Sequence, residues 1–234
     1  MSEQLKKMTE HQCSNAPAKY ADLKALFLNC TLNRTPVLSH TEGLIGVAQK
    51  IFEANGTSTK VIRPVDYEIP AGLGLDMSLT PEWEKDDWPK IQKEIDACDI
   101  LIVCTSVWLG EKSSVCNRTL ERMYGYTHLF NEKGQYRDYG KVGATLITGN
   151  EDGVKHCAMN ILFFLVPYRI YRTAPSGCRL DGRGRTGTIL SGRRLRWPRE
   201  RFYEQKHHFS GMELPAFGTY VKRQWRDTRA RKSA

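Results

Sequence analysis

LFLNCTLNRTPVLSHT, the segment Leu26–Thr41, holds the clearest structural pattern in this chain. The short apolar run Ala25–Leu28 ends abruptly in small polar residues, and a loop rich in Asn, Thr, Arg and Ser follows it. An apolar-periodic stretch then begins at Leu44. Short continuous apolar runs are typical of buried strands, and apolar residues at helical spacing are typical of helices that pack on a core. The segment therefore predicts a buried strand, a polar turn and the start of a helix.

The turn within this segment is a candidate phosphate site. The first turn of a helix offers unpaired backbone N–H groups and the positive end of the helix dipole, so it can hold an anion. Thr31, Ser39 and Thr41 would add hydroxyl groups, and Arg34 would add charge. A solvated turn in which Ser or Thr only caps the helix explains the same residues equally well. This segment alone leaves both interpretations open.

Two later strand ends favour the ligand site. The apolar run Asp99–Cys104 stops in TSVWLG, which is Thr105–Gly110. The apolar run Lys141–Ile147 stops in TGNEDG, which is Thr148–Gly153. Ligands of open parallel α/β sheets bind outside the carboxyl ends of the strands. Three strand ends with small, polar or glycine residues and one Trp suit a flat, phosphate-bearing aromatic cofactor.

With these three loops the chain resembles the flavodoxin-like NADPH-dependent FMN reductase family over roughly residues 22–165. The family's first loop usually reads like GSPR followed by S-x-T. Ser39 and Thr41 match the end of that pattern, whereas Asn29 replaces the Gly. The second loop usually reads like TPIYW-G and is TSVWLG here, with Ser106 where Pro is common. The third loop, TGNEDG, matches well.

The resemblance implies a fold, a cofactor and a set of site residues. The implied fold is an α/β, flavodoxin-like three-layer sandwich with parallel sheet order 2-1-3-4-5. In the family, the first loop binds the FMN phosphate, and the second and third loops flank the isoalloxazine and ribityl parts. The implied FMN-binding residues are Thr31, Arg34, Ser39, Thr41, Thr105, Ser106, Val107, Trp108, Leu109, Gly110, Thr148, Gly149, Asn150, Asp152 and Gly153.

The implied activity is hydride transfer from NADPH or NADH through FMN to a small acceptor, such as a quinone or free flavin. No residue stands out as a nucleophile or general base, in agreement with a flavin enzyme, because the cofactor carries the hydride chemistry. His156, just after the third loop, is more often a helix-face residue than a proton donor. The first alternative is a flavodoxin-type electron carrier without NAD(P)H turnover. The second, less favoured, is nucleic-acid binding through the basic residues 166–234.

The apolar pattern predicts four β-α units and no clear fifth strand. The predicted strands are Leu23–Asn29, Thr59–Pro64, Asp99–Cys104 and Lys141–Ile147. The predicted helices are Thr41–Asn55, Pro89–Ala97, Lys112–Leu129 and Asp152–Leu165. Periodicity stops at Val166, so we expect the fifth strand to be lost or disordered.

The composition favours a cytoplasmic protein without a membrane span or a metal site. The N-terminus MSEQLKKMTEHQ lacks a signal-peptide pattern. No apolar run approaches the roughly 18 residues of a membrane span. The seven cysteines show no CxxC or other metal spacing, which predicts reduced thiols. We expect a small-molecule electron acceptor as the partner, and a homo-oligomer stays open.

Charge divides the chain into two unlike parts. Residues 1–165 carry 18 Lys+Arg and 21 Asp+Glu, whereas residues 166–234 carry 17 Lys+Arg and 5 Asp+Glu. The bases of the second part are 14 Arg and 3 Lys. One folded domain rarely changes composition so sharply. A basic tail by itself would indicate an anionic partner such as nucleic acid.

We interpret the basic part as an out-of-frame translation. Back-translating Val166–Tyr220 and reading one base later permits a string like the family's C-terminal part. Some positions are forced, since Met212-Glu213 must then encode Trp and Trp197-Pro198 must encode Gly. The predicted organisation is a flexible N-terminal arm, an FMN-binding domain and a basic, disordered segment, at residues 1–21, 22–165 and 166–234.

Overall fold

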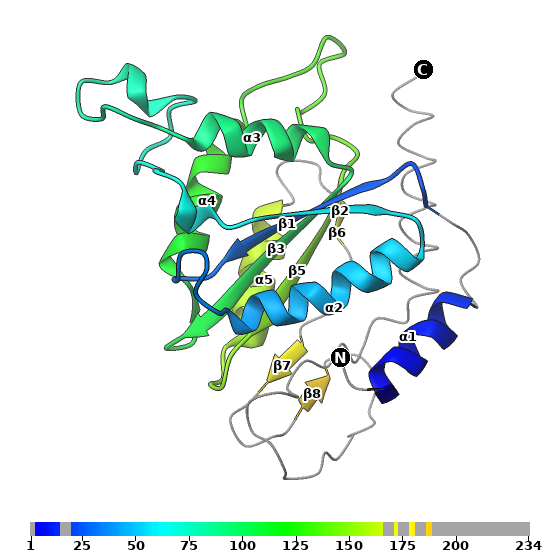
Figure 1. The fold of residues 1–234 in the computed structure, drawn as a ribbon. Helices are drawn as coiled ribbons and strands as arrows, with labels where there is room; N and C mark the ends of the chain where they lie inside the picture. Colours follow the sequence, from blue (N-terminus) through cyan, green and yellow to red (C-terminus); the bar gives the residue numbers. More distant parts are fainter. Residues whose placement is uncertain (1–2, 15–19, 166–170, 173–177, 181–185, 189–234) are drawn as a thin grey trace.

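The computed structural model of this chain describes residues 3–14, 20–165, 171–172, 178–180 and 186–188. A parallel sheet forms the centre of the described part, with helices on both sides (Figure 1). Its principal strands are β1 (Lys24–Cys30), β2 (Ser58–Ile62), β3 (Ile100–Trp108) and β5 (Val142–Thr148). The helices of the domain are α2 (His40–Ala54), α3 (Trp88–Ala97), α4 (Ser114–Tyr124) and α5 (Val154–Leu165).

The strand order is β2-β1-β3-β5-β6, and every pair along it is parallel. This confirms the predicted flavodoxin-like topology. Among the described residues, the fifth strand is reduced to two residues. A two-residue strand β6 (Tyr171–Arg172) occupies that position and pairs with Val142 and Gly143 of β5. The apolar pattern missed β6 because two residues are too few for a recognisable period.

The N-terminal arm and the C-terminal segment contain elements that the pattern did not predict. A helix α1 (Glu3–Ser14) forms within the polar arm. Two short strands, β7 (Cys178–Leu180) and β8 (Thr186–Thr188), pair antiparallel. Apart from β6, β7 and β8, the segment interpreted as out of frame lies outside the described residues, and so does the predicted nucleic-acid contact.

The end of β3 differs from the prediction. The strand continues four residues past Cys104, so the first four residues of TSVWLG are strand and not loop. A two-residue strand β4 (Glu111–Lys112) folds back antiparallel on its end. Residue pairs Val107–Lys112 and Trp108–Glu111 face each other across this hairpin. The turn between them consists of Leu109 and Gly110.

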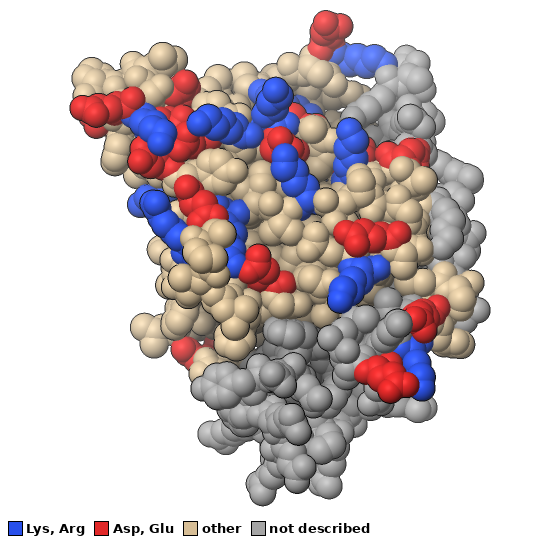
Figure 2. All heavy atoms as spheres, viewed as in Figure 1, with Lys and Arg blue, Asp and Glu red and all other residues tan. Residues whose placement is uncertain are grey.

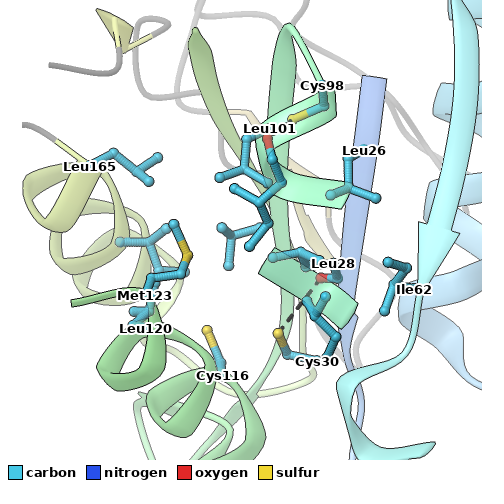
Figure 3. Packing of buried hydrophobic residues seen from close by; sticks show 14 of the residues in the cluster. Leu26, Leu28, Cys30, Ile62, Cys98, Leu101, Cys116, Leu120, Met123 and Leu165 are labelled. Carbon is cyan, nitrogen blue, oxygen red and sulfur yellow. Dashed lines mark hydrogen bonds between the residues drawn. The ribbon is translucent and has the colours of Figure 1, made fainter. Parts of the chain in front are cut away.

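The core has two sides because side chains alternate along each strand. On one side, Leu26, Leu28 and Cys30 of β1 pack with buried residues of α3, α4 and α5. Figure 3 shows Leu120 and Met123 of α4 and Leu165 of α5 pointing toward this side of the sheet. On the other side, β1 packs against α2. The described domain is therefore a three-layer α/β/α sandwich.

A long connection between β2 and α3 is fastened to α4. It contains two short 3-10 helices, η1 (Pro64–Asp66) and η2 (Met77–Leu79). The fully buried side chains of Arg122 and Asp86 form an ion pair beneath it. Asp86 also accepts the N–H groups of Met77 and Trp88, both at 2.8 Å. Trp88 belongs to the core, whereas Trp83 is partly exposed.

Basic and acidic side chains are interspersed over the described face in Figure 2, without a large area of one sign. None of the helices in the described residues has the length and apolar character needed to cross a membrane. In the same residues, no cluster of three or more His, Cys, Asp or Glu side chains is arranged to hold a metal ion.

Candidate functional site

The three predicted loops meet at the carboxyl edge of the sheet. The strands are parallel and in register, with Cys30 beside Thr105 and Ser106 beside Thr148. The connection from β1 to α2 lies at the same edge as the β3–β4 hairpin and the turn before α5 (Figure 1). Segments that are far apart in the sequence therefore border one site.

The first loop, residues 31–39, ends in a capped helix. Ser39 adopts an extended conformation, and its hydroxyl accepts the N–H of Glu42 at 3.3 Å. The cap satisfies one of the free N–H groups in the first turn of α2 and leaves others for an anion. Thr31 is buried at the start of the loop, and Arg34 is exposed within it. The Ser39 cap was the alternative interpretation of this turn, and the structure contains that cap.

The hydroxyl of Thr41 connects the first loop to the third. Its Oγ1 lies 2.8 Å from Oγ1 of Thr148, and both side chains are buried. Thr41 stands in the first turn of α2, and Thr148 is the last residue of β5. Either hydroxyl can donate, so the pair has one proton left for another acceptor in the site.

Two residues that the sequence analysis did not select shape the first loop. Arg63, just after β2, donates through Nη1 to the carbonyl oxygens of Asn33 at 3.3 Å and Val37 at 2.9 Å. Its Nη2 pairs with the carboxylate of Glu42. The Arg63 side chain is only 6% exposed. A buried guanidinium thus contacts the backbone of the first loop.

Asp66 holds the middle of the same loop. Its carboxylate oxygens accept the N–H of Thr35 at 2.9 Å and the Thr35 hydroxyl at 2.7 Å. Asp66 belongs to η1, three residues after Arg63. In the sequence, Arg63 and Asp66 form only a pair of opposite charges three residues apart. Such pairs are common on solvated surfaces, so the pattern does not indicate a role in the loop.

Within the second segment, Thr105 is engaged inside the fold. Its Oγ1 accepts the N–H of Ser113 at 3.1 Å and lies 3.3 Å from the Ser113 hydroxyl. Ser113 Oγ donates to the carbonyl of Cys30 at 2.6 Å and caps α4 by accepting the N–H of Cys116 at 3.0 Å. Thr105 and Ser113 therefore tie the ends of β3 and β1 to the start of α4.

The β3–β4 hairpin carries the exposed apolar groups of the site. Trp108 is half exposed, and its indole N–H donates to the Ser106 hydroxyl at 2.8 Å. Leu109 is 93% exposed and has φ of 50°, and Gly110 has φ of 82°. Two positive φ values are what a two-residue type I′ hairpin turn requires. An apolar side chain held outward in this way is available to cover a flat ligand. Val107 instead is buried against α5 residues.

The third segment fits closely against the second. Gly149 lies against Val107, and a Cβ added at Gly153 would stand 2.5 Å from the carbonyl oxygen of Gly110. Gly153 also has φ of 127°, which favours glycine. Asn150 and Asp152 are exposed, and Asp152 Oδ1 accepts the Gly153 N–H at 2.9 Å.

A side-chain hydrogen bond joins these two segments. His156 Nε2, in the first turn of α5, lies 2.7 Å from Glu111 Oε1 in β4. Both side chains are about half exposed. His156 is therefore neither buried nor alone, and it borders the site as a helix-face residue.

The buried Asn29 provides a test of whether the site suits a polar cofactor. This residue stands near the end of β1 and is fully buried. Neither its amide nitrogen nor its oxygen has a hydrogen-bond partner among the described residues. Leaving such a group unpaired costs about 1–3 kcal/mol, so natural proteins rarely do so without a reason. An orphan amide at the strand end that enters the first loop fits a site whose polar ligand is bound from outside the chain.

The cysteines near the site are buried thiols. A hydrogen bond with Cys116, together with burial, raises the pKa of Cys30 well above its usual value. Burial raises the pKa of Cys157 to about 11. Thiolates are the reactive form, so both residues are expected to be inert packing groups.

Comparison with known proteins agrees with this geometry. A model of the family described as "NADPH-dependent FMN reductase" matches residues 23–166. The match ends at the position where the charge of the chain changes.

Two curated proteins match this chain over part of their own length. The chain is 36% identical over 144 residues to the 8-demethyl-8-aminoriboflavin-5′-phosphate synthase of Streptomyces davaonensis, covering 60% of this chain and 56% of that protein. It is 46% identical over 157 residues to the divalent metal cation transporter MntH of Mycobacterium bovis, covering 67% of this chain and 23% of the transporter. The chain thus spans only part of either relative, and the transporter's activity is not carried over.

Among solved structures, the chain is similar to RosB bound to 8-demethyl-8-formylriboflavin-5′-phosphate. The TM-score is 0.68 at 27% identity, and the alignment covers 91% of this chain and 88% of RosB. A flavone reductase aligns with a TM-score of 0.51 at 12% identity over 68% of this chain and 54% of the reductase, a likeness of fold alone.

Proposed function

This chain belongs to the NADPH-dependent FMN reductase family, and we propose that it binds FMN at the carboxyl edge of its sheet and passes electrons from NADPH or NADH to a small acceptor. One observation carries the proposal. Three strand ends converge beside the first turn of α2, with Thr41 and Thr148 in contact across them. A quinone or a free flavin is the acceptor class we propose.

The residues have separate roles in this proposal. The first turn of α2, with Ser39, Thr41 and Thr31, holds the phosphate, and Arg34 adds positive charge from outside. The hairpin residues Trp108 and Leu109 cover the ring and exclude water from one side of it. Asn150 and the backbone of the third segment border the ring edge. Bound FMN supplies the hydride chemistry, which the side chains of this site lack.

A second candidate function follows from the similarity to the aminoriboflavin-phosphate synthase and RosB. In this alternative the flavin phosphate is the substrate. The enzyme alters its ring and then releases the modified flavin phosphate. The same phosphate loop and ring-covering hairpin would serve both functions. A flavodoxin-type carrier, which holds the flavin but does not oxidise NAD(P)H, is the third possibility. A cytoplasmic location and a homo-oligomeric state stay predictions.

One experiment separates these functions. The purified full chain is loaded with FMN and mixed anaerobically with NADPH or NADH, and the yellow absorbance and the mass of the flavin are followed. Rapid bleaching, reversed by a quinone with the flavin mass unchanged, supports the reductase. The modifying enzyme is tested in a parallel incubation of the FMN-loaded chain in air with an amine donor, where a changed flavin mass supports it. A bound flavin that neither nucleotide bleaches contradicts the reductase and supports the carrier.

A further inference from the structure

We propose that Arg63 is a positioning residue that makes the first loop able to bind phosphate, an inference that rests on the proposed FMN site. An anion-binding loop must present its N–H groups to the anion and turn its carbonyl oxygens away, because carbonyl oxygens repel negative charge. The guanidinium of Arg63 donates to the carbonyl oxygens of Asn33 and Val37. Two of the loop's negative dipoles are thereby directed at Arg63 and not at an anion.

Charge gives Arg63 a second role. Glu42 stands in the first turn of α2, where its carboxylate would oppose a phosphate at the same helix end. Arg63 pairs with this carboxylate and neutralises it. The side chain of Arg63 is 6% exposed, whereas that of Glu42 is 46% exposed, so the guanidinium acts from inside the protein.

Asp66 occupies two hydrogen-bond donors of the loop, so that other donors are left for the ligand. Because Asp66 accepts both the N–H and the hydroxyl of Thr35, these two groups of Thr35 are already engaged within the protein. The groups left at the helix end are the first-turn amides and the hydroxyls of Ser39 and Thr41. Arg63 and Asp66 together thus form a two-point brace on the loop.

The planar fork of arginine suits this position better than the point charge of lysine. One guanidinium reaches two carbonyl oxygens and one carboxylate, which a single ammonium group cannot do with the same fixed geometry. We therefore expect a lysine at position 63 to keep the charge but to hold the loop less well.

Comparing FMN with riboflavin tests the proposal, because riboflavin lacks the phosphate. Both dissociation constants are measured by flavin fluorescence quenching with the full chain. We expect R63Q to weaken FMN binding by about 10- to 100-fold, by analogy with the loss of metal affinity when a residue that orients a metal ligand is removed. Riboflavin binding should change by less than about twofold, since Arg63 acts only on the phosphate loop. R63K should show an intermediate loss of FMN affinity, and it serves as the test variant if R63Q does not fold.

Two further variants make the test specific. E42Q removes a negative charge from the helix end and should tighten FMN binding by about two- to fivefold, the effect of one charge near a helix N-terminus. A purely structural ion pair predicts the opposite, because E42Q and R63Q would then weaken FMN alike. K60Q is the matched control. It removes a basic charge from β2, the strand that Arg63 follows, where Lys60 pairs with Glu94 at 2.8 Å. The affinities for both flavins should stay unchanged in this variant.

The results can contradict the role of Arg63 separately from the proposed function. If wild type binds FMN and R63Q reduces FMN and riboflavin affinity by the same factor, the positioning role is wrong while the proposed function stands. The same conclusion follows if E42Q weakens FMN binding as R63Q does. If the wild-type chain binds neither flavin, the proposed function itself is wrong, and the role of Arg63 is overturned with it.

Discussion

The hydroxyl oxygens of Thr41 and Thr148 lie 2.8 Å apart across 107 positions of sequence. This contact joins the first turn of α2 to the end of β5 and so holds two of the three site segments together. Both side chains are buried, and each hydroxyl is the other's hydrogen-bond partner. The site is therefore assembled partly by its own polar groups.

We predict that this pair behaves non-additively in a double-mutant cycle. T41V or T148V alone leaves one buried hydroxyl unpaired and should cost about 1–3 kcal/mol of unfolding free energy. Because the double variant has no unpaired hydroxyl, it should cost no more than the worse single variant. Urea unfolding of the four proteins measures this. Additive costs would show that the two hydroxyls do not depend on each other.

Gly153→Ala should damage both stability and flavin binding. The new Cβ would stand 2.5 Å from a backbone oxygen of Gly110, at φ of 127°. We expect a loss of more than about 1 kcal/mol and weaker FMN binding, because the second and third segments must separate. Gly134→Ala is the control: φ is 70° there but no atom lies within 4 Å of its Cβ. Equal losses in the two variants would mean that backbone strain and not the close approach is responsible.

Removing one partner of the buried Arg122–Asp86 pair should destabilise the domain strongly. R122M leaves a buried carboxylate without its counter-charge and should cost about 3–5 kcal/mol. The control is R137M, which breaks the partly exposed Arg137–Asp96 pair and should cost about 1 kcal/mol or less. Thermal and urea unfolding are the measurements. A small loss for R122M would indicate that water or repacking replaces the pair.

The free energy of unfolding should depend on pH in the acidic range because of the Asp87 carboxyl. The Lys90 ammonium, 2.7 Å from Oδ1, and the Glu68 N–H lower the pKa of the Asp87 carboxyl from 3.8 to about 2. A carboxyl whose folded pKa is lowered stabilises the fold above its unfolded pKa, and that stabilisation is lost as the pH falls through the folded value. The difference in unfolding free energy between wild type and D87N should therefore be constant above about pH 4 and shrink toward pH 2. A difference that is flat across this range would contradict the assignment.

The frame interpretation also predicts an outcome. Removing one base near the Leu165 codon should give a protein that is more soluble than the chain encoded here and that holds FMN more tightly, because a full fifth strand in place of the two-residue β6, and the last helix of the family fold, would then be encoded. Lysate solubility and flavin content after gel filtration measure this. If the unaltered gene yields equally soluble protein with stoichiometric FMN, residues 166–234 are a natural tail.

Local sequence pattern was sufficient for the four principal strands of the sheet, and it placed the candidate site at their carboxyl ends. Apolar runs predicted β1 and β5 to within one residue at each end, because burial on both faces leaves a continuous hydrophobic signature. The small polar residues after each run predicted where the strands end on the ligand side. They predicted less well the end of β3, because Thr105–Trp108 can be either strand or loop by composition.

Only the tertiary structure could identify the residues that hold the site in shape. Arg63 and Asp66 follow β2, and the loop that they brace follows β1, so the parallel pairing of the two strands places them together. Likewise, the sequence shows Asn29 only as a residue that replaces the Gly of a loop motif. The structure shows that its amide is buried without a hydrogen-bond partner among the described residues. The sequence by itself determined the four principal strands and the helices that follow them, and it predicted the edge where a ligand would bind, since these depend on neighbours along the chain. The partners of each polar group depend on residues tens of positions away, and folding alone brings those together.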